Sequence, residues 1–162
     1  MDKKLGRRTS TSKLAANSVV TGVGALFYSV ATQRCLYLLR SQKQRGTWGL
    51  VGGKQTPGES VQDTLYREFT EEIGDVPQPH RLIPLETFTS DDHYFKFITY
   101  ACIVPAEFTP VLNAEHHGYC WVQIGEFPRP LHPGLWNTMN FSVIQAKINT
   151  ICSVTDWYFY RS

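Results

Sequence analysis

Short runs of apolar residues separated by polar turns follow one another along most of the chain, a pattern typical of strands joined by loops. The first run, residues 19–30, is rich in β-branched and aromatic residues and predicts a mostly buried strand. Residues 41–46 are polar and predict a turn. By the same criteria, the other predicted strands cover residues 34–40, 48–53, 81–89, 94–104 and 119–124.

The segment of residues 60–73 instead places an apolar residue at every fourth position, which is the period of a helix with one buried face. These apolar residues are Val61, Leu65, Phe69 and Ile73. Gly74 predicts the end of this helix, and Pro77 and Pro79 prevent its continuation. A last helix is predicted within residues 135–152.

Strands combined with two helices predict a single α/β domain in which the helices pack on a mixed sheet. A chain of 162 residues has the size of one ordinary domain, and it contains no internal repeat and no linker long enough to separate two folded units. We expect this domain to cover residues 16–162, preceded by a basic, flexible tail at residues 1–15.

The positive charge of the chain is concentrated at its N-terminus. Residues 1–13 hold five basic residues against one Asp, a net charge of +4, whereas the rest of the chain carries −2. A solvated, disordered arm is the first interpretation of such a segment. The alternatives are a segment that binds nucleic acid or phosphate weakly and an organelle-targeting peptide.

The composition is that of a packed globular protein, with 42% hydrophobic and 13% aromatic residues. No apolar run approaches the roughly 20 residues that a membrane-spanning helix needs, and no secretory signal precedes the domain. We therefore expect a soluble, cytoplasmic protein with no membrane partner.

The cysteines are scattered and form no C-x-x-C pair. We expect buried free thiols rather than a zinc site or disulfides, because each cysteine lies in an apolar context. The four positions are Cys35, Cys102, Cys120 and Cys152.

Three glutamates share one side of the predicted helix at residues 60–73. Successive helical residues turn by about 100°, so Glu68, Glu71 and Glu72 fall within an arc of about 100°. Their like charges repel, and Arg67 is the only cation between residues 63 and 72. A divalent cation would offset this charge, since magnesium prefers oxygen ligands. An ordinary acidic solvent face is the alternative.

A glycine pair, Gly52 and Gly53, precedes the helix, with Lys54 directly after it and Glu59 at the helix start. Paired glycines let the backbone approach a ligand closely, and free N–H or C=O groups there can contact phosphate or metal.

The residues from Gly53 to Gly74 together resemble the signature of the Nudix hydrolase family. That signature is Gly, five residues, Glu, seven residues, Arg-Glu, an apolar residue, any residue, Glu-Glu, any residue, Gly and an apolar residue. The chain supplies Gly53, Glu59, Arg67, Glu68, Phe69, Glu71, Glu72 and Gly74 at those spacings. The final apolar position departs from the pattern, because Asp75 stands there.

The resemblance continues outside this box. Residues 46–53 are similar to the lead-in strand of the family, with Val51 where proline is commoner. Residues 113–122 are similar to the loop and strand that often bring in a further glutamate, which is Glu115 in this chain.

The resemblance implies the Nudix fold, an α/β fold with a mixed β-sheet sandwiched between helices. It also implies a Mg²⁺-dependent pyrophosphohydrolase, with Mn²⁺ as a substitute ion, in which water attacks phosphorus and NDP-X gives NMP and phospho-X. The implied partner is a nucleoside diphosphate-linked small molecule of the nucleotide, nucleotide-sugar, ADP-ribose or dinucleotide type. We expect a monomer or a homodimer.

Residue roles follow from position in the motif. The implied metal ligands are Glu68, Glu71, Glu72 and the carbonyl of Gly52. The implied catalytic residues are Glu68, Glu71, Glu115 and Arg67, with either Glu115 or a box glutamate as general base. Glu59 and Gly74 are implied structural supports. The candidate substrate-binding residues are Gly53, Lys54, Arg40 and Tyr94.

Some candidates keep two interpretations. His116 and His117 are expected to be exposed loop residues or structural ones, with a phosphate contact as the alternative. A base would need an aromatic platform or an apolar slot, but core packing also explains the available aromatic residues. These are Phe27, Tyr94, Phe95 and Trp121.

Two other functions compete with hydrolysis of a small nucleotide-linked molecule. One is an RNA 5′-end pyrophosphohydrolase whose basic arm holds the strand, although we do not expect a nucleic-acid partner. The other is a catalytically silent nucleotide sensor on the same fold, which the retention of every box carboxylate argues against.

Overall fold

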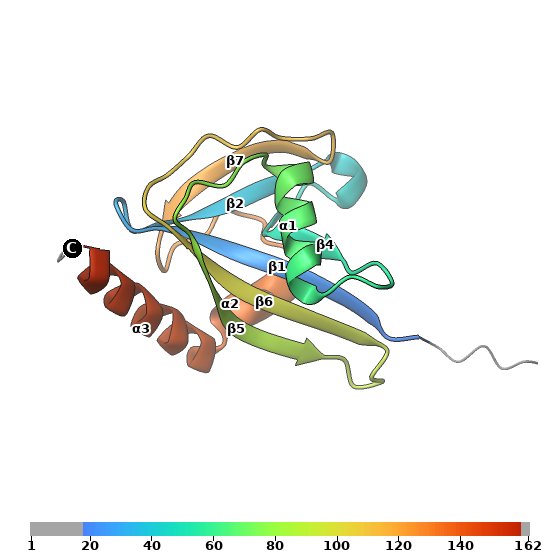
Figure 1. The fold of residues 1–162 in the computed structure, drawn as a ribbon. Helices are drawn as coiled ribbons and strands as arrows, with labels where there is room; N and C mark the ends of the chain where they lie inside the picture. The colour runs from blue at the N-terminus through green and yellow to red at the C-terminus, as the bar shows by residue number, and fades with distance from the viewer. Residues whose placement is uncertain (1–17, 160–162) are drawn as a thin grey trace, which may run out of the picture.

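The computed structural model describes residues 18–159. Within these residues the strands form a seven-stranded sheet with helices on both faces (Figure 1). The strands are β1 (Val20–Ser29), β2 (Arg34–Arg40), β3 (Trp48–Gly49), β4 (Val51–Lys54), β5 (Arg81–Thr89), β6 (Phe95–Val104) and β7 (His116–Gln123). The helices are α1 (Val61–Glu72), α2 (Pro133–Asn140) and α3 (Ser142–Phe159), and a short 3-10 turn covers Gln42–Gln44.

The sheet is mixed, since β1 and β6 run parallel while the other pairs are antiparallel. Its strand order is β3-β2-β1-β6-β5, with β4 paired to β1 and β7 paired to β2. Along one edge, β1 pairs with β4 at residues 22–25 and with β2 at residues 27–29. On this side of β1 the neighbouring strand therefore changes from β4 to β2, and the glycine pair lies in β4.

Helix α1 has the buried face that its sequence predicts. Leu65, Phe69 and Ile73 are at most 2% exposed and pack against the sheet. Ser60 caps the N-terminus, because its side chain accepts a hydrogen bond from the Asp63 N–H and the Asp63 carboxylate accepts one from the Ser60 N–H. This capping box fixes where the helix begins.

Two hydrophobic cores lie on opposite faces of the sheet. One joins α1 to the inward-facing residues of β1 and β2, such as Val23 and Leu36. The other joins α2 and α3 to the opposite face of the same strands, through residues such as Leu26 and Leu135. The predicted sandwich of a mixed sheet between helices is confirmed.

Three predicted elements are corrected. Residues 48–53 form two strands and not one, because the chain breaks at Leu50 so that β3 pairs with β2 and β4 with β1. The last predicted helix is two helices, since Phe141 is extended and separates α2 from α3. Strand β7 begins at His116, three residues before the predicted start at Tyr119.

Cys35, Cys102 and Cys152 are buried free thiols, whereas Cys120 is free and half-buried. None of the helices within residues 18–159 has both the length and the apolar composition needed to cross a membrane. The predicted basic tail at residues 1–15 lies outside the described residues, so the domain start at residue 16 stays a prediction.

Candidate functional site

The glycine pair of β4 lies directly beside the carboxylates of α1. The Gly52 N–H donates a 2.8 Å hydrogen bond to Glu72 Oε2. A methyl group at residue 53 would overlap the Glu68 carboxylate, so that carboxylate lies against the Gly53 backbone. Glycine is required at both positions because a side chain would displace an α1 carboxylate or a neighbouring strand.

Arg67 joins the start and the middle of the box. Its Nε and Nη2 donate to the two carboxylate oxygens of Glu59, at 2.7 and 3.1 Å. Nη2 also donates to the carbonyl of Lys54 at the end of β4, at 3.1 Å. This two-point contact with Glu59 fixes the guanidinium plane. The pKa of Glu59 is held well below its usual range, chiefly by its hydrogen bonds from Arg67.

The same guanidinium orients the catalytic candidates. Arg67 Nη1 donates to Glu68 Oε1 at 2.7 Å and to Glu71 Oε2 at 3.3 Å. The side chain of Glu68 is 11% exposed, whereas that of Glu71 is 53% exposed. The three glutamates of α1 therefore share one side of the helix but differ in burial, and Glu71 is the most open to a ligand.

Negative charge accumulates around these side chains. Burial raises the pKa of Glu72 to about 8, and the charges of Glu68 and Glu115 add to that rise. Burial likewise raises the pKa of Glu68, with contributions from Glu71 and Glu115. Glu115 belongs to the loop before β7, so the structure brings this loop glutamate into the field of the α1 carboxylates.

His116 is buried beside Glu72, and its neighbour His117 is exposed. One ring nitrogen, Nδ1, lies 3.2 Å from Asn113 Oδ1, and the other, Nε2, lies 4.0 Å from Glu72 Oε1. Burial lowers the pKa of His116 to about 4, with help from Arg40 and His117. His116 is therefore uncharged near neutral pH and makes no ion pair with Glu72.

The donor chemistry suits a hard divalent cation, because the three α1 carboxylates and the Gly52 carbonyl supply oxygen atoms. As the side chains are arranged, however, no group of three or more His, Cys, Asp or Glu residues within residues 18–159 is placed to hold a metal ion. The hydrogen bonds explain this arrangement: Arg67 engages Glu68 and Glu71, and the Gly52 N–H engages Glu72. Metal binding at these residues requires side-chain rotation, most easily by the exposed Glu71.

A cavity of about 970 Å³ opens from the glycine pair toward α2, on the sheet face opposite α1. Gly52, Gly53 and Lys54 line one end of it. Arg40 lines it as well, and its Nε atom is buried without a hydrogen-bond partner in the described part of the chain. The cavity therefore has a cationic end next to the glutamate box, as an anionic ligand requires.

The floor of the cavity is aromatic. The Phe97 ring lies on the backbone of β1, where a methyl group at Gly22 would approach Phe97 Cδ2 to 2.6 Å. Its neighbour Phe95 lies at a ring-centroid distance of 6.3 Å. Phe88 on β5 lies 6.4 Å from Phe95, and all three phenylalanines line the cavity.

The predicted site residues fall into three groups. The structure brings Glu59, Arg67, Glu68, Glu71, Glu72, Gly52 and Gly53 together, and Gly74 ends α1 with a φ of 78°. Arg40, Lys54 and Gly53 line the cavity. Tyr94 is 49% exposed and lies outside the residues that line it.

Among the candidate base platforms, Phe27 is fully buried in the core and Trp121 packs on Phe108. Phe95 alone of that set lines the cavity. The residues that sequence reasoning missed are those of the cavity wall, chiefly Glu86, Phe97 and residues of α2 such as Leu135, Asn137 and Thr138. The available signal was Glu86, the only charged residue in the stretch 82–89.

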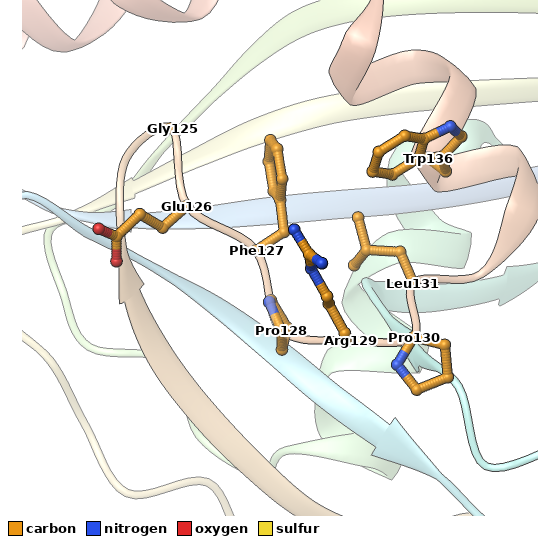
Figure 2. Close-up of a pocket in the computed structure, with 8 residues that line it drawn as sticks. All are labelled: Gly125, Glu126, Phe127, Pro128, Arg129, Pro130, Leu131 and Trp136. Carbon is orange, nitrogen blue, oxygen red and sulfur yellow. The ribbon is translucent and has the colours of Figure 1, made fainter.

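A second, smaller cavity of about 700 Å³ lies in the loop before α2 (Figure 2). Phe127, Leu131 and Trp136 supply its apolar lining, and Glu126 and Arg129 supply its charged groups. Neither the α1 carboxylates nor the glycine pair contributes to it. We therefore assign no part of the candidate site to this cavity.

Comparison with known proteins converges on a single family. The NUDIX domain profile matches residues 19–140. A nucleoside triphosphatase, NudI of Escherichia fergusonii, is 30% identical over an alignment of 89 residues that covers 48% of this chain and 62% of that protein. NudI of Salmonella arizonae is 30% identical over 108 residues, 57% of this chain and 76% of that protein.

Solved structures show the same fold at lower identity. The NUDIX domain of Shewanella oneidensis NrtR, complexed with ADP ribose, matches with a TM-score of 0.62 and 19% identity, covering 82% of this chain and 89% of that one. The Nudix hydrolase RenU of M. smegmatis matches with a TM-score of 0.60 and 17% identity, covering 85% and 87% of the two chains.

Proposed function

Because the chain belongs to the Nudix hydrolase family, we propose that it is a Mg²⁺-dependent pyrophosphohydrolase, with Mn²⁺ as a substitute ion. Its substrate is a nucleoside diphosphate linked to a further group. The observation that carries this proposal is that the α1 glutamates lie beside the glycine pair, which also lines one end of the cavity. The Gly52 N–H donates to Glu72, and Gly52, Gly53 and Lys54 are lining residues.

The reaction consumes one water and one diphosphate linkage. A P–O bond forms to the water oxygen, the P–O bond to the bridging oxygen breaks, and NMP and phospho-X leave. When bound, the metal neutralises phosphate oxygens and makes water more acidic. In our proposal Glu68, Glu71, Glu72 and the Gly52 carbonyl hold that ion, because their oxygen atoms are the donors that magnesium prefers.

We propose that the carboxylate of Glu115 is the general base and accepts the proton of the attacking water. The charge of Glu115 helps to raise the pKa of both Glu68 and Glu72, which supports a position of Glu115 beside the reacting water. Its backbone is fixed, because the Glu115 N–H donates to Asn113 Oδ1 and the Glu115 carbonyl accepts from the Ser41 N–H. Glu115 is not among the hydrogen-bond partners of Arg67. A box glutamate remains the alternative base.

Arg67 acts as a positioning residue in this proposal, because it holds Glu68 while Glu59 holds Arg67. Arg40 and Lys54 meet substrate phosphates at the cationic end of the cavity. The rest of the substrate extends over the phenylalanine floor toward α2.

The two relatives named nucleoside triphosphatases support substrates of the nucleotide class. A nucleoside triphosphate is itself a nucleoside diphosphate linked to phosphate, so it belongs to the proposed substrate class. The match spans only 62% of the first of these relatives. In our proposal the cavity residues of this chain carry the choice of substrate.

The test is a substrate screen with identified products. The purified chain is incubated with nucleoside triphosphates, ADP-ribose, nucleotide sugars, dinucleoside polyphosphates and 5′-triphosphate RNA, in Mg²⁺ or Mn²⁺. We expect NMP as one product of a small-molecule substrate. RNA as the best substrate would replace the proposal with 5′-end hydrolysis, and no turnover of any substrate would replace it with a nucleotide sensor.

A further inference from the structure

One oxygen of a carboxylate at the far end of the cavity has no partner. Glu86 Oε2 is buried and accepts no hydrogen bond from the described residues. The other oxygen, Oε1, receives only a long contact of 3.4 Å from the Thr138 hydroxyl. A buried acceptor without a donor is costly, and folded proteins keep few of them. Glu86 lines the cavity, and a rotation of its side chain would present this unmet acceptor to a ligand there.

A β-bulge directs Glu86 into this cavity. Pro84 pairs with Tyr100 and Glu86 pairs with Thr99, so Leu85 is an extra residue in β5. Leu85 packs into the core on the α2 side, and the bulge lets the next residue, Glu86, line the cavity on that side as well. Bulges of this kind reorient a side chain near functional sites.

The strand register places Glu86 at a defined distance from the glutamate box. Glu86 pairs with Thr99, and Thr99 pairs with Gly24. Gly24 pairs in turn with Gly52. Three strand spacings therefore separate Glu86 from Gly52, about 14 Å. One molecule can extend along this row, with its phosphates at the glycine pair and its base at Glu86.

The space between these two ends suits a flat ring. Phe97 lies on the β1 glycines, and Phe88 and Phe95 border it. Aromatic side chains stack on nucleobases of any kind, so the floor favours a base without selecting one. Selection then depends on polar groups that line the cavity, and Glu86 is the only carboxylate among the described residues that do so.

An ionised carboxylate only accepts hydrogen bonds, and its two oxygens are best satisfied by two N–H donors side by side. Guanine presents a ring N–H next to an exocyclic amine. Adenine and cytosine present their amine next to a ring nitrogen that accepts, and uracil and thymine flank their N–H with two carbonyls. Resting on the proposed nucleotide function, we propose that Glu86 makes this site selective for guanine-type bases.

Binding of nucleoside monophosphates tests this inference without turnover. Calorimetric titration of the full chain with GMP, IMP and AMP isolates the base, and IMP differs from GMP only by the missing amine. We expect GMP to bind about 10- to 100-fold more tightly than AMP, with IMP in between. The variant Glu86→Gln replaces one acceptor by a donor and should remove the difference between GMP and IMP.

Glu126→Gln is the matched control, since Glu126 is an exposed carboxylate beside the other cavity. It should keep the preference of the wild type, and thermal melting of each variant confirms folding. Equal binding of GMP and AMP by the wild type, binding of none of the three, or an unchanged preference in Glu86→Gln would overturn the inference. The first two outcomes are measured on the wild-type chain, so the inference can be contradicted even if Glu86→Gln fails to fold.

Failure of this inference differs from failure of the proposed function. A Glu86-dependent preference for GMP without hydrolysis of any diphosphate would support base selection by Glu86 and contradict the proposed pyrophosphohydrolase activity. Hydrolysis of GTP and ATP at equal rates, with equal binding of GMP and AMP, would keep the enzyme and remove the role of Glu86.

Discussion

The Glu68 carboxylate lies against the backbone of Gly53, in the space that a methyl group at residue 53 would fill. This contact lets Arg67 reach Glu68 Oε1 at 2.7 Å while Gly52, one residue earlier, donates to Glu72. The two glycines thus hold two carboxylates in place from adjacent positions. A methyl group would meet different atoms at the two positions, so substitution of each glycine should have a different effect.

Substitution of the two glycines should separate activity from stability. In Gly53→Ala the methyl group meets only the end of a flexible side chain, so Glu68 moves and the fold persists. We expect kcat to fall about 100-fold, as small displacements at a reacting centre do, with the melting temperature almost unchanged.

Gly52→Ala is the matched variant. Its methyl group would overlap Val23 O and Gly24 Cα, which are backbone atoms of β1. We expect a loss of stability of about 1–3 kcal/mol and a melting temperature lower by about 3–10 °C. Equal loss of stability in both variants, measured by thermal melting, would show that Glu68 is not held as described.

Substitution of Arg67 tests its role as a positioning residue. Lysine keeps the charge but cannot contact both oxygens of Glu59 and also reach Glu68. We expect Arg67→Lys to lower kcat by about 10- to 100-fold, as loss of a supporting contact does at metal sites, with KM nearly constant. A raised KM with normal kcat would instead assign Arg67 to substrate binding.

Substitution of Arg40 tests the cationic end of the cavity. Arg40 lines the same cavity as Gly52, Gly53 and Lys54, so in our proposal its guanidinium binds a substrate phosphate. We expect Arg40→Gln to lower kcat/KM about 10-fold, because a charge-assisted hydrogen bond is lost. Arg129→Gln, at the smaller cavity, is the control and should leave kcat/KM unchanged. Similar losses in both variants would point to a general effect of charge.

Metal binding should also be visible without substrate. A ligand that binds only the folded state at about 100 times its Kd adds about 2.7 kcal/mol, which is about 5–10 °C in melting temperature for a chain of this size. We expect Mg²⁺ to raise the melting temperature and EDTA to reverse the rise. Glu71→Gln should reduce this shift, while NaCl at equal ionic strength should not produce it. A shift of equal size in Glu71→Gln would place the ion elsewhere.

The sequence predicted the parts of the site that depend on local spacing. The period of Val61, Leu65 and Phe69 places the glutamates on one side of α1, and Gly74 ends that helix as expected. The family resemblance added Arg67 and Glu59, whose hydrogen bonds now explain why their spacing matters. These features lie within 22 residues and need no knowledge of strand pairing.

The base end of the cavity could not be predicted in the same way. Strict alternation along β5 gives Leu85 and Glu86 opposite faces, and only the bulge at Leu85 brings both to the α2 side. Likewise, the position of the Phe97 ring over Gly22 depends on the register that pairs these two residues. The break at Phe141 that separates α2 from α3 was missed because no proline or glycine marks it.

The most direct test of the central claim is the Mg²⁺-dependent release of NMP from the best substrate by three proteins: wild type, Glu71→Gln and Glu126→Gln. Glu71 is exposed, so its substitution leaves the core intact. We predict that Glu71→Gln lowers kcat by about 100-fold or more, and that Glu126→Gln behaves as wild type. Near-normal release of NMP by Glu71→Gln, in a protein that melts like the wild type, would contradict the assignment of this glutamate box as the catalytic centre.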